Sequence, residues 1–572
     1  MCSLPYKRTR FSYDMFSRAV RPVLATRRTL ATAAGPKKSR VWPKVLAGFG
    51  LLGGTLYYTN DNFHDATRHA FITAERISVV TVATARCFKI YKDVLGTDFQ
   101  DEEIRRNAMS QAHLKAAKIT LKALETNRGI YIKLGQHISA LTYILPPEWT
   151  ETMKPLQDQC PRSSKDEIED MFRKDMGVEL DEYFSDFDWN PVGVASLAQV
   201  HIAEVRGSGE KVAVKLQHPL LAEFVPLDIY LIQTVYELIT KVFPEYPMTW
   251  LSDELRSSIF VELDFVNEAE NAMKTTAEFA NMYELTSLRV PQIIYSEKRI
   301  LVMEYVAGKR LDDLEFMKNN NISPAEVSSC LSHIFNNMIF TPNVGLHCDP
   351  HLGNLAIRVV EPSENKSGHN FEIVLYDHGL YRYIPLQMKR DYSHFWLAIL
   401  DNDVPKMKEY AQKFAGIEGD QKFRVFIAAI TGRDPSTALN YDITKTRDET
   451  EIEAIQLLLY TESGVLESLM DILANMPRIV LLILKTNDLT RNLDEGLGNS
   501  LGPERTFLIM ANYCARDVYE ESLELNSKLY RRYTWSWFAS NVSSWFAYRK
   551  RVSSLFFYDL ALFFRNLRGS FS

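Results

Sequence analysis

The spacing of apolar residues predicts helices in the first part of the chain. From residue 71 to about 126, apolar positions recur every three or four residues, as on one face of a helix. After a break at Gly129 the same spacing resumes in IYIKLGQHISALTYIL, a helix that we expect to stop at Pro146 and Pro147. Ser164, followed by an acidic turn, indicates the start of another helix.

Alternation of apolar and polar residues replaces the helical spacing near residue 191. The run ASLAQVHIAEVRGSGEKVAVKLQHP predicts two strands joined at Gly207 and Gly209, with Lys215 at the end of the second strand. The run RILVMEYVAG predicts another strand, and LAIRVV with FEIVLYD a second hairpin around a polar loop at 361–370. Helical spacing fills 219–283, follows from 323, and occupies everything beyond 385. The pattern therefore predicts an α+β fold.

The first 40 residues differ in composition from the rest of the chain. They hold ten Lys or Arg and one acid, Asp14, with Ser, Thr and Ala between them. This composition is typical of a mitochondrial targeting presequence, and a basic tail is the alternative.

An apolar segment follows at 41–60. From Val41 to Thr59, with Lys44 reaching toward the surface, a helix would extend ~28 Å and could cross a bilayer. A buried glycine-rich helix or a part of the presequence is the alternative. Since basic residues crowd the N-terminal side, we expect the N-terminus in the matrix and the remaining chain in the intermembrane space.

The composition of the whole chain is typical of a globular protein, and the chain carries no net positive charge. With 46% hydrophobic residues, 572 residues are enough for full apolar cores. A net charge of −6 gives no electrostatic support for binding nucleic acid. The six cysteines are scattered and do not suggest a disulfide framework.

Five polar residues match the order of groups in a phosphate-transfer site. Lys215 closes the strand VAVK, where an ammonium could reach phosphates, and Glu268 on a helix could hold it. In GLHCDPHLGNLAI, Asp349 is a candidate catalytic base, and Asn354 has the spacing of a metal ligand. Asp377, in VLYDHG, could bind magnesium from the other side. Each motif alone is weak, and the ordered set carries the prediction.

Zinc is the alternative explanation of the same run. His347, Cys348 and His351 are side chains of the kind that bind zinc. Neighbouring residues rarely hold one ion from a single turn, however, and the sequence has no second cluster with zinc spacing. We therefore favour the phosphate-transfer prediction.

Three motifs resemble the UbiB, or aarF-domain, family of atypical kinase-like proteins. KLGQ, with Lys133, Gly135 and Gln136, reproduces the K-x-G-Q motif of that family, and ELD, with Glu262 and Asp264, its E-x-D motif. GVAS stands where the family has an alanine-rich loop, and DHG, with histidine for phenylalanine, resembles its mitochondrial branch. The resemblance covers about 100–400 and implies a bilobal kinase-like fold with a helical extension over the cleft. It also implies that Lys133, Gly135, Gln136, Glu262 and Asp264 form a gate there.

The same resemblance implies a nucleotide site. Family members bind ATP or ADP with Mg²⁺, show ATPase rather than protein-kinase behaviour, and support coenzyme Q distribution and lipid homeostasis at the mitochondrial inner membrane. By correspondence, the nucleotide would contact the loop, the strand lysine and the hinge-like strand end: Gly193, Val194, Ala195, Ser196, Lys215, Glu304 and Val306. Lipids of that membrane, coenzyme Q or a precursor, and a second copy of the chain are the expected partners. A nucleotide-gated scaffold without turnover and a small-molecule kinase are the alternative functions.

The C-terminal run RRYTWSWFASNVSSWFAYRKRVSSLFFYDLALFFRNLR interleaves aromatic and basic residues. It fits a helix at an anionic membrane surface or a helix packed on the C-lobe. The expected segments are a presequence (1–40), a transmembrane helix (41–60), a helical extension (61–160), an N-lobe with inserted helices (161–308), a C-lobe (309–500) and this C-terminal segment (501–572).

Overall fold

The structure is a computed structural model that describes residues 61–99, 101–141, 145–157, 160, 162–244, 248–361, 363, 365–431, 472, 475–498 and 502–569. From Thr73 onward the described residues form one compact unit. Among the described residues, no helix is both long and apolar enough to span a bilayer. The predicted presequence and the predicted membrane helix at 41–60 lie outside the described residues.

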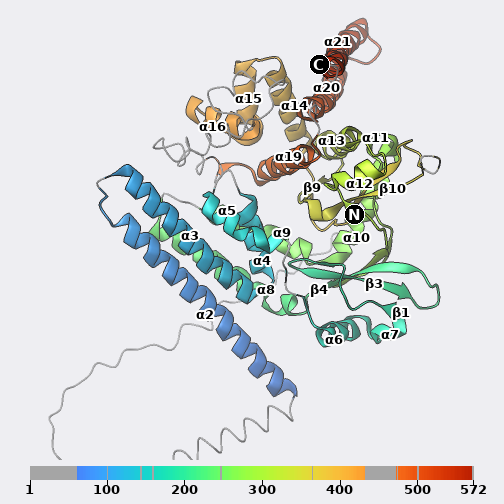
Figure 1. The fold of residues 1–572 in the computed structure, drawn as a ribbon. Helices are drawn as coiled ribbons and strands as arrows, with labels where there is room; N and C mark the ends of the chain where they lie inside the picture. Colours follow the sequence, from blue (N-terminus) through green and yellow to red (C-terminus); the bar gives the residue numbers. More distant parts are fainter. Residues whose placement is uncertain are drawn as a thin grey trace, which may run out of the picture. The chain divides into compact units, whose positions relative to one another are not determined.

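Helices form the first part of the described chain, as predicted (Figure 1). α2 (Asp61–Leu95) and α3 (Glu102–Asn127) precede α4 (Ile130–Ala140), and Gly129 separates α3 from α4 with a φ of +56°. The prolines were misassigned: α4 ends at Ala140, and Pro147 begins α5 (Pro147–Met153). Proline suits the first turn of a helix because its missing N–H would have no partner there.

α6 (Lys165–Met176) begins where the sequence predicted a helix start. The Ser164 hydroxyl accepts a hydrogen bond from the Glu167 amide, and the Glu167 carboxylate accepts from the Ser164 amide, so the two residues form a capping box. α6 buries Ile168, Met171 and Phe172 against one face of the following sheet. This packing leaves the other face of the sheet for the functional residues.

The six-stranded sheet has the strand order β1-β3-β4-β7-β6, with β2 paired to β3. Its strands are β1 (Phe184–Phe187), β2 (Gly193–Val194), β3 (Ala198–Val205), β4 (Lys211–Gln217), β6 (Ile293–Glu297) and β7 (Ile300–Glu304). The predicted hairpin is β3 with β4, and it turns through Gly207 and Gly209, both with positive φ. Lys215 lies inside β4, which continues to Gln217, so its placement at the strand end was wrong. It pairs with Val200 and Leu301.

The alternation of side chains along β4 determines where Lys215 points. Val212, Val214 and Leu216 face the α6 layer, and Ala213 faces α10. Lys215 shares the face of Ala213, because side chains two residues apart in a strand lie on the same side. The helices after β4 are α8 (Leu220–Val242), α9 (Thr249–Glu262), α10 (Phe265–Phe279), η2 (Ala280–Met282) and α11 (Tyr283–Thr286). α10 packs on β6 and β7.

A second, mostly helical part is formed by the chain after β7 together with β5, which precedes β7. Its four-stranded sheet has the order β5-β11-β10-β8, and β9 pairs with β12. These strands are β5 (Leu288–Arg289), β8 (Lys309–Arg310), β9 (Leu346–His347), β10 (Leu355–Val359), β11 (Phe371–Leu375) and β12 (Tyr381–Arg382). β10 and β11 are the predicted second hairpin, with Leu355 opposite Leu375. This hairpin places Asn354, the residue before β10, next to Tyr376 and Asp377, which follow β11.

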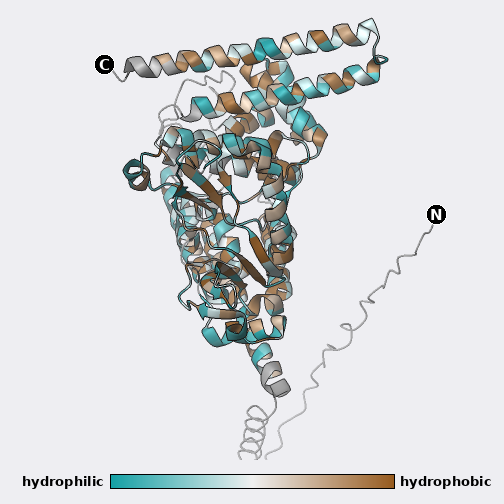
Figure 2. Ribbon diagram, turned by 90° about the vertical axis from the view of Figure 1, so that its right-hand side faces the viewer, coloured by the Kyte–Doolittle hydropathy of each residue, from teal (hydrophilic) through white to brown (hydrophobic). Residues whose placement is uncertain are grey.

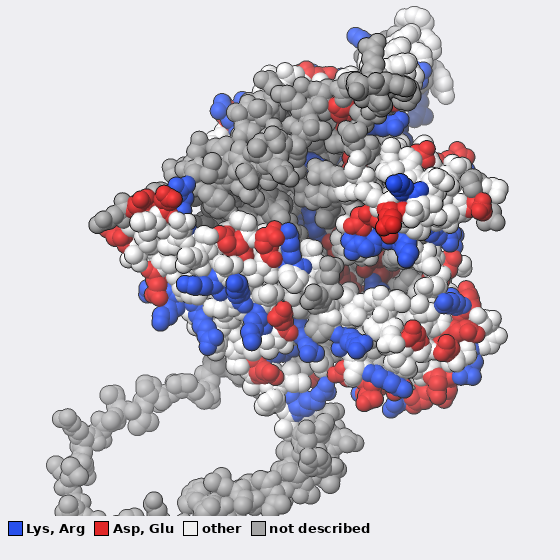
Figure 3. All heavy atoms as spheres, viewed as in Figure 1, with Lys and Arg blue, Asp and Glu red and all other residues white. Residues whose placement is uncertain are grey.

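Helices supply most of the core of this second part. They are α12 (Leu314–Asn319), α13 (Pro324–Phe340), α14 (Leu386–Leu400), α15 (Val404–Ala415), α16 (Asp420–Thr431), α19 (Arg478–Gly496), α20 (Gly502–Leu529) and α21 (Trp535–Gly569). Every described element beyond 385 is a helix, as predicted. On the face in Figure 3, Lys and Arg are interspersed with Asp and Glu. The mixed α and β content and the two sheets agree with the predicted α+β class.

Candidate active site

One ammonium and two carboxylates meet between the six-stranded sheet and α10. Lys215 Nζ lies 2.6 Å from Glu268 Oε1 and 3.0 Å from Asp377 Oδ2. The ion pair between Lys215 and Glu268 joins β4 to the first turns of α10. Asp264 caps this helix by accepting a hydrogen bond from the Val266 amide. These contacts bring together three residues that the sequence predicted, and they fix the direction in which Lys215 extends.

The charges in this group depend strongly on one another. Burial alone would lower the pKa of Lys215, but Asp377 and Glu268 raise it above its ordinary range, so the amine stays protonated. Burial raises the pKa of Glu268 to about 7, although Lys215 opposes this shift. Burial would also raise the pKa of Asp377, but Lys215 and the Gly379 amide hold it below its usual range. Asp377 therefore stays ionised beside Lys215, whereas Glu268 gains a proton easily near neutral pH.

The D-H-G segment is held by α10 and by its own hydrogen bonds. The Gly379 amide donates to Asp377 Oδ1 at 2.8 Å, and Asn271 Nδ2 donates to the His378 carbonyl at 3.0 Å. The His378 ring lies within hydrogen-bonding distance of the Leu375 carbonyl and the Tyr381 hydroxyl, at 3.2 and 3.0 Å. Since a carbonyl can only accept, Nε2 donates to it and Nδ1 accepts from the tyrosine.

His378 is therefore a neutral, fully paired side chain. Burial, reinforced by His347, lowers the pKa of His378 to about 3. Its ring stacks on Tyr381 with a centroid distance of 5.8 Å and an interplanar angle of 11°. Histidine can thus replace an apolar phenylalanine here because the burial of its two nitrogens is compensated by two hydrogen bonds.

Asp349 and Asn354 lie between β9 and β10, near the end of β11. Asn354 Nδ2 donates to the Asp349 carbonyl at 3.0 Å, and the Tyr376 amide donates to the Asn354 carbonyl at 3.0 Å. Asn354 therefore adjoins the residue before Asp377. The Asp349 amide donates to His347 Nδ1 at 3.0 Å, so this buried histidine supports the loop from inside.

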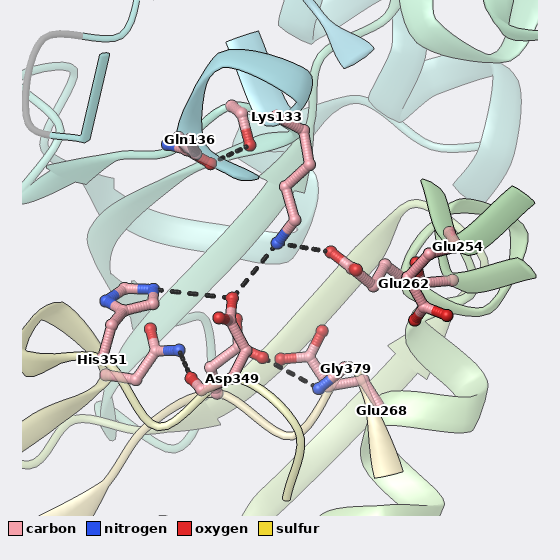
Figure 4. Close-up of polar contacts among 12 residues, drawn as sticks. Lys133, Gln136, Glu254, Glu262, Glu268, Asp349, His351 and Gly379 are labelled. Carbon is pink, nitrogen blue, oxygen red and sulfur yellow. Dashed lines mark hydrogen bonds and ion pairs between the residues drawn. The ribbon is translucent and has the colours of Figure 1, made fainter. Parts of the chain in front are cut away.

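Lys133 reaches this site from α4 (Figure 4). Its ammonium lies 2.9 Å from Glu262 Oε2 and 3.2 Å from Asp349 Oδ2. Glu262 is the last residue of α9, so the K-x-G-Q and E-x-D motifs meet through one ion pair over the candidate base. Asp264 has a different role from Glu262, because its carboxylate caps α10. The predicted gate residues therefore act at three separate places.

Gly135 and Gln136 fix the position of α4. A Cβ at Gly135 would lie 2.2 Å from Leu156 Cδ1 and 3.0 Å from Leu124 Cδ1, so no larger residue fits without movement. Gln136 Nε2 donates to the Leu156 carbonyl at 3.0 Å, and the Ser196 hydroxyl donates to Gln136 Oε1 at 3.3 Å. α4 is thereby tied both to the short helix η1 (Lys154–Gln157) and to the GVAS loop.

The sequence analysis did not find a second cation on the candidate base. Lys485, on α19, lies 2.9 Å from Asp349 Oδ1, so both carboxylate oxygens contact an ammonium. Burial alone would raise the pKa of Asp349, but Lys133 and Lys485 hold it well below its usual range. His137, one turn after Lys133, was also missed, and burial together with Lys485 and Lys133 lowers its pKa to about 3. The residues around Lys485 form no motif, so the sequence gives no pattern from which its contact with Asp349 could be predicted.

The GVAS segment begins with β2 and continues through Ala195 and Ser196 toward β3. The Ala195 amide donates to the Ala198 carbonyl at 2.8 Å, and His218 Nε2 donates to the Ala195 carbonyl at 3.1 Å. Gly193 pairs with Val200 and Val194 with Gln199 in the sheet. A Cβ on Gly193 would meet nothing within 4 Å, so alanine would fit there.

The two predicted hinge residues lie at and after the end of β7. The Glu304 carboxylate pairs with Arg289, at 2.6 Å, and its amide donates to the Gln292 carbonyl at 2.8 Å. Val306 is buried, and its carbonyl accepts a hydrogen bond from the Tyr376 hydroxyl at 2.9 Å. Tyr376 directly precedes Asp377, so the hinge segment and the D-H-G segment are joined.

The donor set fits magnesium better than zinc. Mg²⁺ prefers oxygen ligands and is commonly held by one or two carboxylates together with phosphates. Asp377 offers a carboxylate kept ionised, and Asn354 an amide whose nitrogen is occupied, leaving its oxygen as the ligand atom. Within the described residues, no group of three or more His, Cys, Asp or Glu side chains is placed to hold a metal ion.

A strand lysine paired with a helix glutamate, an aspartate after the second hairpin and an H-x-D-x-x-x-x-N loop together define an atypical protein-kinase-like site. Comparison with known families agrees with this class. Residues 155–411 match the model described as "ABC1 atypical kinase-like domain". The chain belongs to this family of ABC1, AarF or UbiB proteins.

Two fungal relatives and one vertebrate relative show how far the similarity extends. The chain is 54% identical over 525 residues to "ABC1 family protein MCP2" of Saccharomyces cerevisiae, with 90% of this chain and 92% of the relative covered. It is 46% identical to the "ABC1 family protein MCP2 homolog" of Schizosaccharomyces pombe, with 80% and 82% covered. Identity to "AarF domain-containing protein kinase 1" of Gallus gallus is 34%, with 74% and 79% covered. The resemblance seen in the sequence motifs is thereby confirmed.

Proposed function

We propose that this protein is a membrane-anchored atypical kinase or ATPase that binds ATP or ADP with Mg²⁺ and supports coenzyme Q distribution and lipid homeostasis at the mitochondrial inner membrane. The observation that carries the nucleotide site is the Lys215–Glu268 contact of 2.6 Å with Asp377 beside it. Membership of an atypical kinase-like family supports it. The mitochondrial and lipid parts of the proposal rest on the presequence composition and on the family resemblance.

The chain's own residues suggest how the site would work. Lys215, held extended by Glu268, would donate to the phosphates, and Asp377 with Asn354 would hold Mg²⁺, which would supply positive charge to them. The Ala195–Ser196 loop and the strand end at Glu304 and Val306 would border the nucleotide. Contacts link Lys215, Glu268 and Asp377, and the loop and the strand end are assigned by correspondence with the family.

Asp349 is poorly placed to accept a proton from an acceptor hydroxyl. Its two oxygens contact Lys133 and Lys485 at 3.2 and 2.9 Å, and the low pKa of this carboxylate makes it a weak base. Transfer to a protein or small-molecule acceptor would require α4 to move, because Lys133 occupies the space over the carboxylate. This observation favours ATP hydrolysis over an ordinary kinase reaction, and it disfavours the small-molecule kinase.

The same contacts favour one alternative, a nucleotide-gated scaffold without turnover. In that case nucleotide binding would change the position of α4 and thereby the shape of a surface that binds a partner. The two functions differ in whether the cell needs ATP hydrolysis. An Asp349→Asn variant that still replaces the wild-type gene while showing no hydrolysis would favour the scaffold.

The test uses the purified full-length chain reconstituted in lipid vesicles. We expect Mg²⁺-dependent ATP hydrolysis that falls to background in Asp377→Asn, whereas the control Asp186→Asn, an exposed aspartate on β1, keeps the wild-type rate. Equal hydrolysis by Asp377→Asn and wild type would overturn the nucleotide site. Lipid and quinone profiles of mitochondria that carry either variant then test the biological role.

A further inference from the structure

The last helix carries an exposed aromatic face that the nucleotide site does not use. In α21, Trp535 is 80% exposed, Phe546 62% and Phe557 65%. The same face includes the exposed side chains of Phe538, Trp545, Phe556 and Leu560. At about 100° per residue these seven residues fall within an arc of about 120°, and they extend over about 38 Å of helix. We call this set the outer face of α21.

The opposite side of α21 packs on the protein. Leu555 and Leu562 are buried in the main hydrophobic core, and Tyr548 stacks on Tyr519 of α20 with centroids 4.8 Å apart. The Arg551 guanidinium makes a bidentate ion pair with the Asp401 carboxylate, at 2.7 and 2.6 Å. The inner side of α21 therefore agrees with one of the two predictions for this segment, a helix packed on the C-lobe. Figure 2 shows polar and apolar residues interleaved along α21, the helix that ends near the C-terminus.

The exposed apolar area is too large to be incidental. Six aromatic side chains with these exposed fractions present on the order of 700 Å². The largest apolar patch on a typical monomer is about 300–600 Å², and such patches are often functional. An area of this size at a helix surface is expected to be covered in the working protein.

The charges on this face indicate what covers it. Arg549 lies near the middle of the outer face and Lys550 at its edge, and both are exposed. Arg531 and Arg532, also exposed, come just before the helix. The only acid in α21 is Asp559, which lies about 40° beyond the edge of the outer face and contacts Arg505 at 3.7 Å. The outer face is therefore aromatic and basic, without compensating acids.

We propose that the outer face of α21 docks flat on an anionic phospholipid bilayer. Aromatic side chains suit the boundary between headgroups and acyl chains, and basic residues gain from anionic headgroups. A membrane-spanning role does not fit, because three consecutive basic residues, 549–551, lie in the middle of α21 between its apolar residues.

A second copy of the chain is a less suitable occupant. A symmetric antiparallel contact along 535–560 would place its two-fold axis near residue 548. Arg549 and Lys550 of both copies would then face one another in an apolar interface, which is unfavourable. The proposal does not depend on the nucleotide site, and a failure of either would leave the other standing.

The test must separate α21 from any anchor near the N-terminus, so it measures the helix in the full-length chain. A fluorescent amino acid replaces Phe546, and in a matched control it replaces Tyr230, an aromatic residue of α8 that is 66% exposed. Each protein is reconstituted in phosphatidylcholine vesicles with or without a minority of anionic phospholipid. Spin-labelled lipid then reports by quenching which positions touch the bilayer.

We expect strong quenching at 546 in anionic vesicles and none at 230. Replacing Arg549 and Lys550 together by Gln should lower the ratio of docked to free helix about 25-fold, since each basic residue near an anionic surface contributes about fivefold. A Trp535→Ser/Phe557→Ser variant should also lose quenching, whereas Tyr230→Ser should not. All these positions are exposed, so unchanged thermal unfolding is expected for each variant.

Two results would overturn the proposal. One is equal and weak quenching at 546 in neutral and anionic vesicles. The other is a shielded fluorophore that lipid does not quench and whose shielding grows with protein concentration, which would show that a second copy covers the face.

Discussion

Replacing Lys133 by Met should destabilise the protein strongly and in a pH-dependent way. The side chain of Lys133 is 11% exposed and contacts Glu262 and Asp349 at 2.9 and 3.2 Å. At an effective dielectric constant of about 20, each contact corresponds to about 5–6 kcal/mol before desolvation. Desolvation offsets much of this, and removal of one partner from a buried pair typically costs about 3–5 kcal/mol. We expect a loss of that size for Lys133→Met near neutral pH.

The pH dependence comes from Glu262. Burial already raises the pKa of Glu262, and Lys133 opposes the shift, so the variant should raise that pKa further. The folded variant then binds a proton more tightly than the unfolded chain, and its stability falls as pH rises above the unfolded value of about 4.3. Asp349 keeps Lys485 and stays ionised over this range. The deficit of the variant should therefore be larger at pH 8 than at pH 5.

Thermal unfolding of wild type, Lys133→Met, Glu262→Gln and the double variant, each at pH 5 and pH 8, measures both effects. The double variant should recover part of the loss, because no charged Glu262 is left unpaired, and its pH dependence should return toward that of the wild type. A double variant no more stable than Lys133→Met, or a deficit independent of pH, would refute this account of the ion cluster.

Two other substitutions test the close packing of α4 on Leu156 and the contact between Lys485 and Asp349. Gly135→Ala should cost about 1–3 kcal/mol, because the new methyl group would meet Leu156 Cδ1 at 2.2 Å, and Leu156→Ala in the same chain should restore part of the thermal stability; wild-type stability in the single variant would contradict the close contact. Lys485→Met should raise the pKa of Asp349 toward its ordinary value. Since the stability from a depressed carboxyl pKa is present at neutral pH and lost as pH falls through that pKa, the midpoint of acid unfolding should move to higher pH, with Lys528→Met, an exposed lysine of α20, unchanged.

The sequence predicted those parts of the site that depend on local geometry. Alternation along the strands placed Lys215 on a strand, although not at its end, and predicted the hairpin before Asp377, while helical spacing placed Glu268 on a helix. Asp349 and Asn354 came from a motif whose spacing is imposed by one loop. In each case a few neighbouring residues determine where the side chain points, so a pattern within a short window was enough.

The remaining features depend on packing between distant segments. Lys485 contacts a residue 136 positions away, and nothing in the sequence around it distinguishes it from an exposed helix lysine. Pro146 and Pro147 were read as a stop signal, but a proline that ends one helix and one that begins the next look alike in sequence. Asp264 was grouped with Glu262 by its motif, whereas the structure uses it to cap the helix that carries Glu268.

The two cations on Asp349 also have a consequence for biosynthesis. Lys133 precedes Asp349 by 216 residues, and Lys485 follows it by 136. At about 5–20 residues per second, a ribosome adds the α19 lysine about 7–27 seconds after the aspartate. During that interval Lys133 is the only one of the two lysines that the growing chain contains. The shortest segment that contains Asp349 and both lysines therefore runs from α4 through α19, and residues 155–411, which match the family model, contain neither lysine.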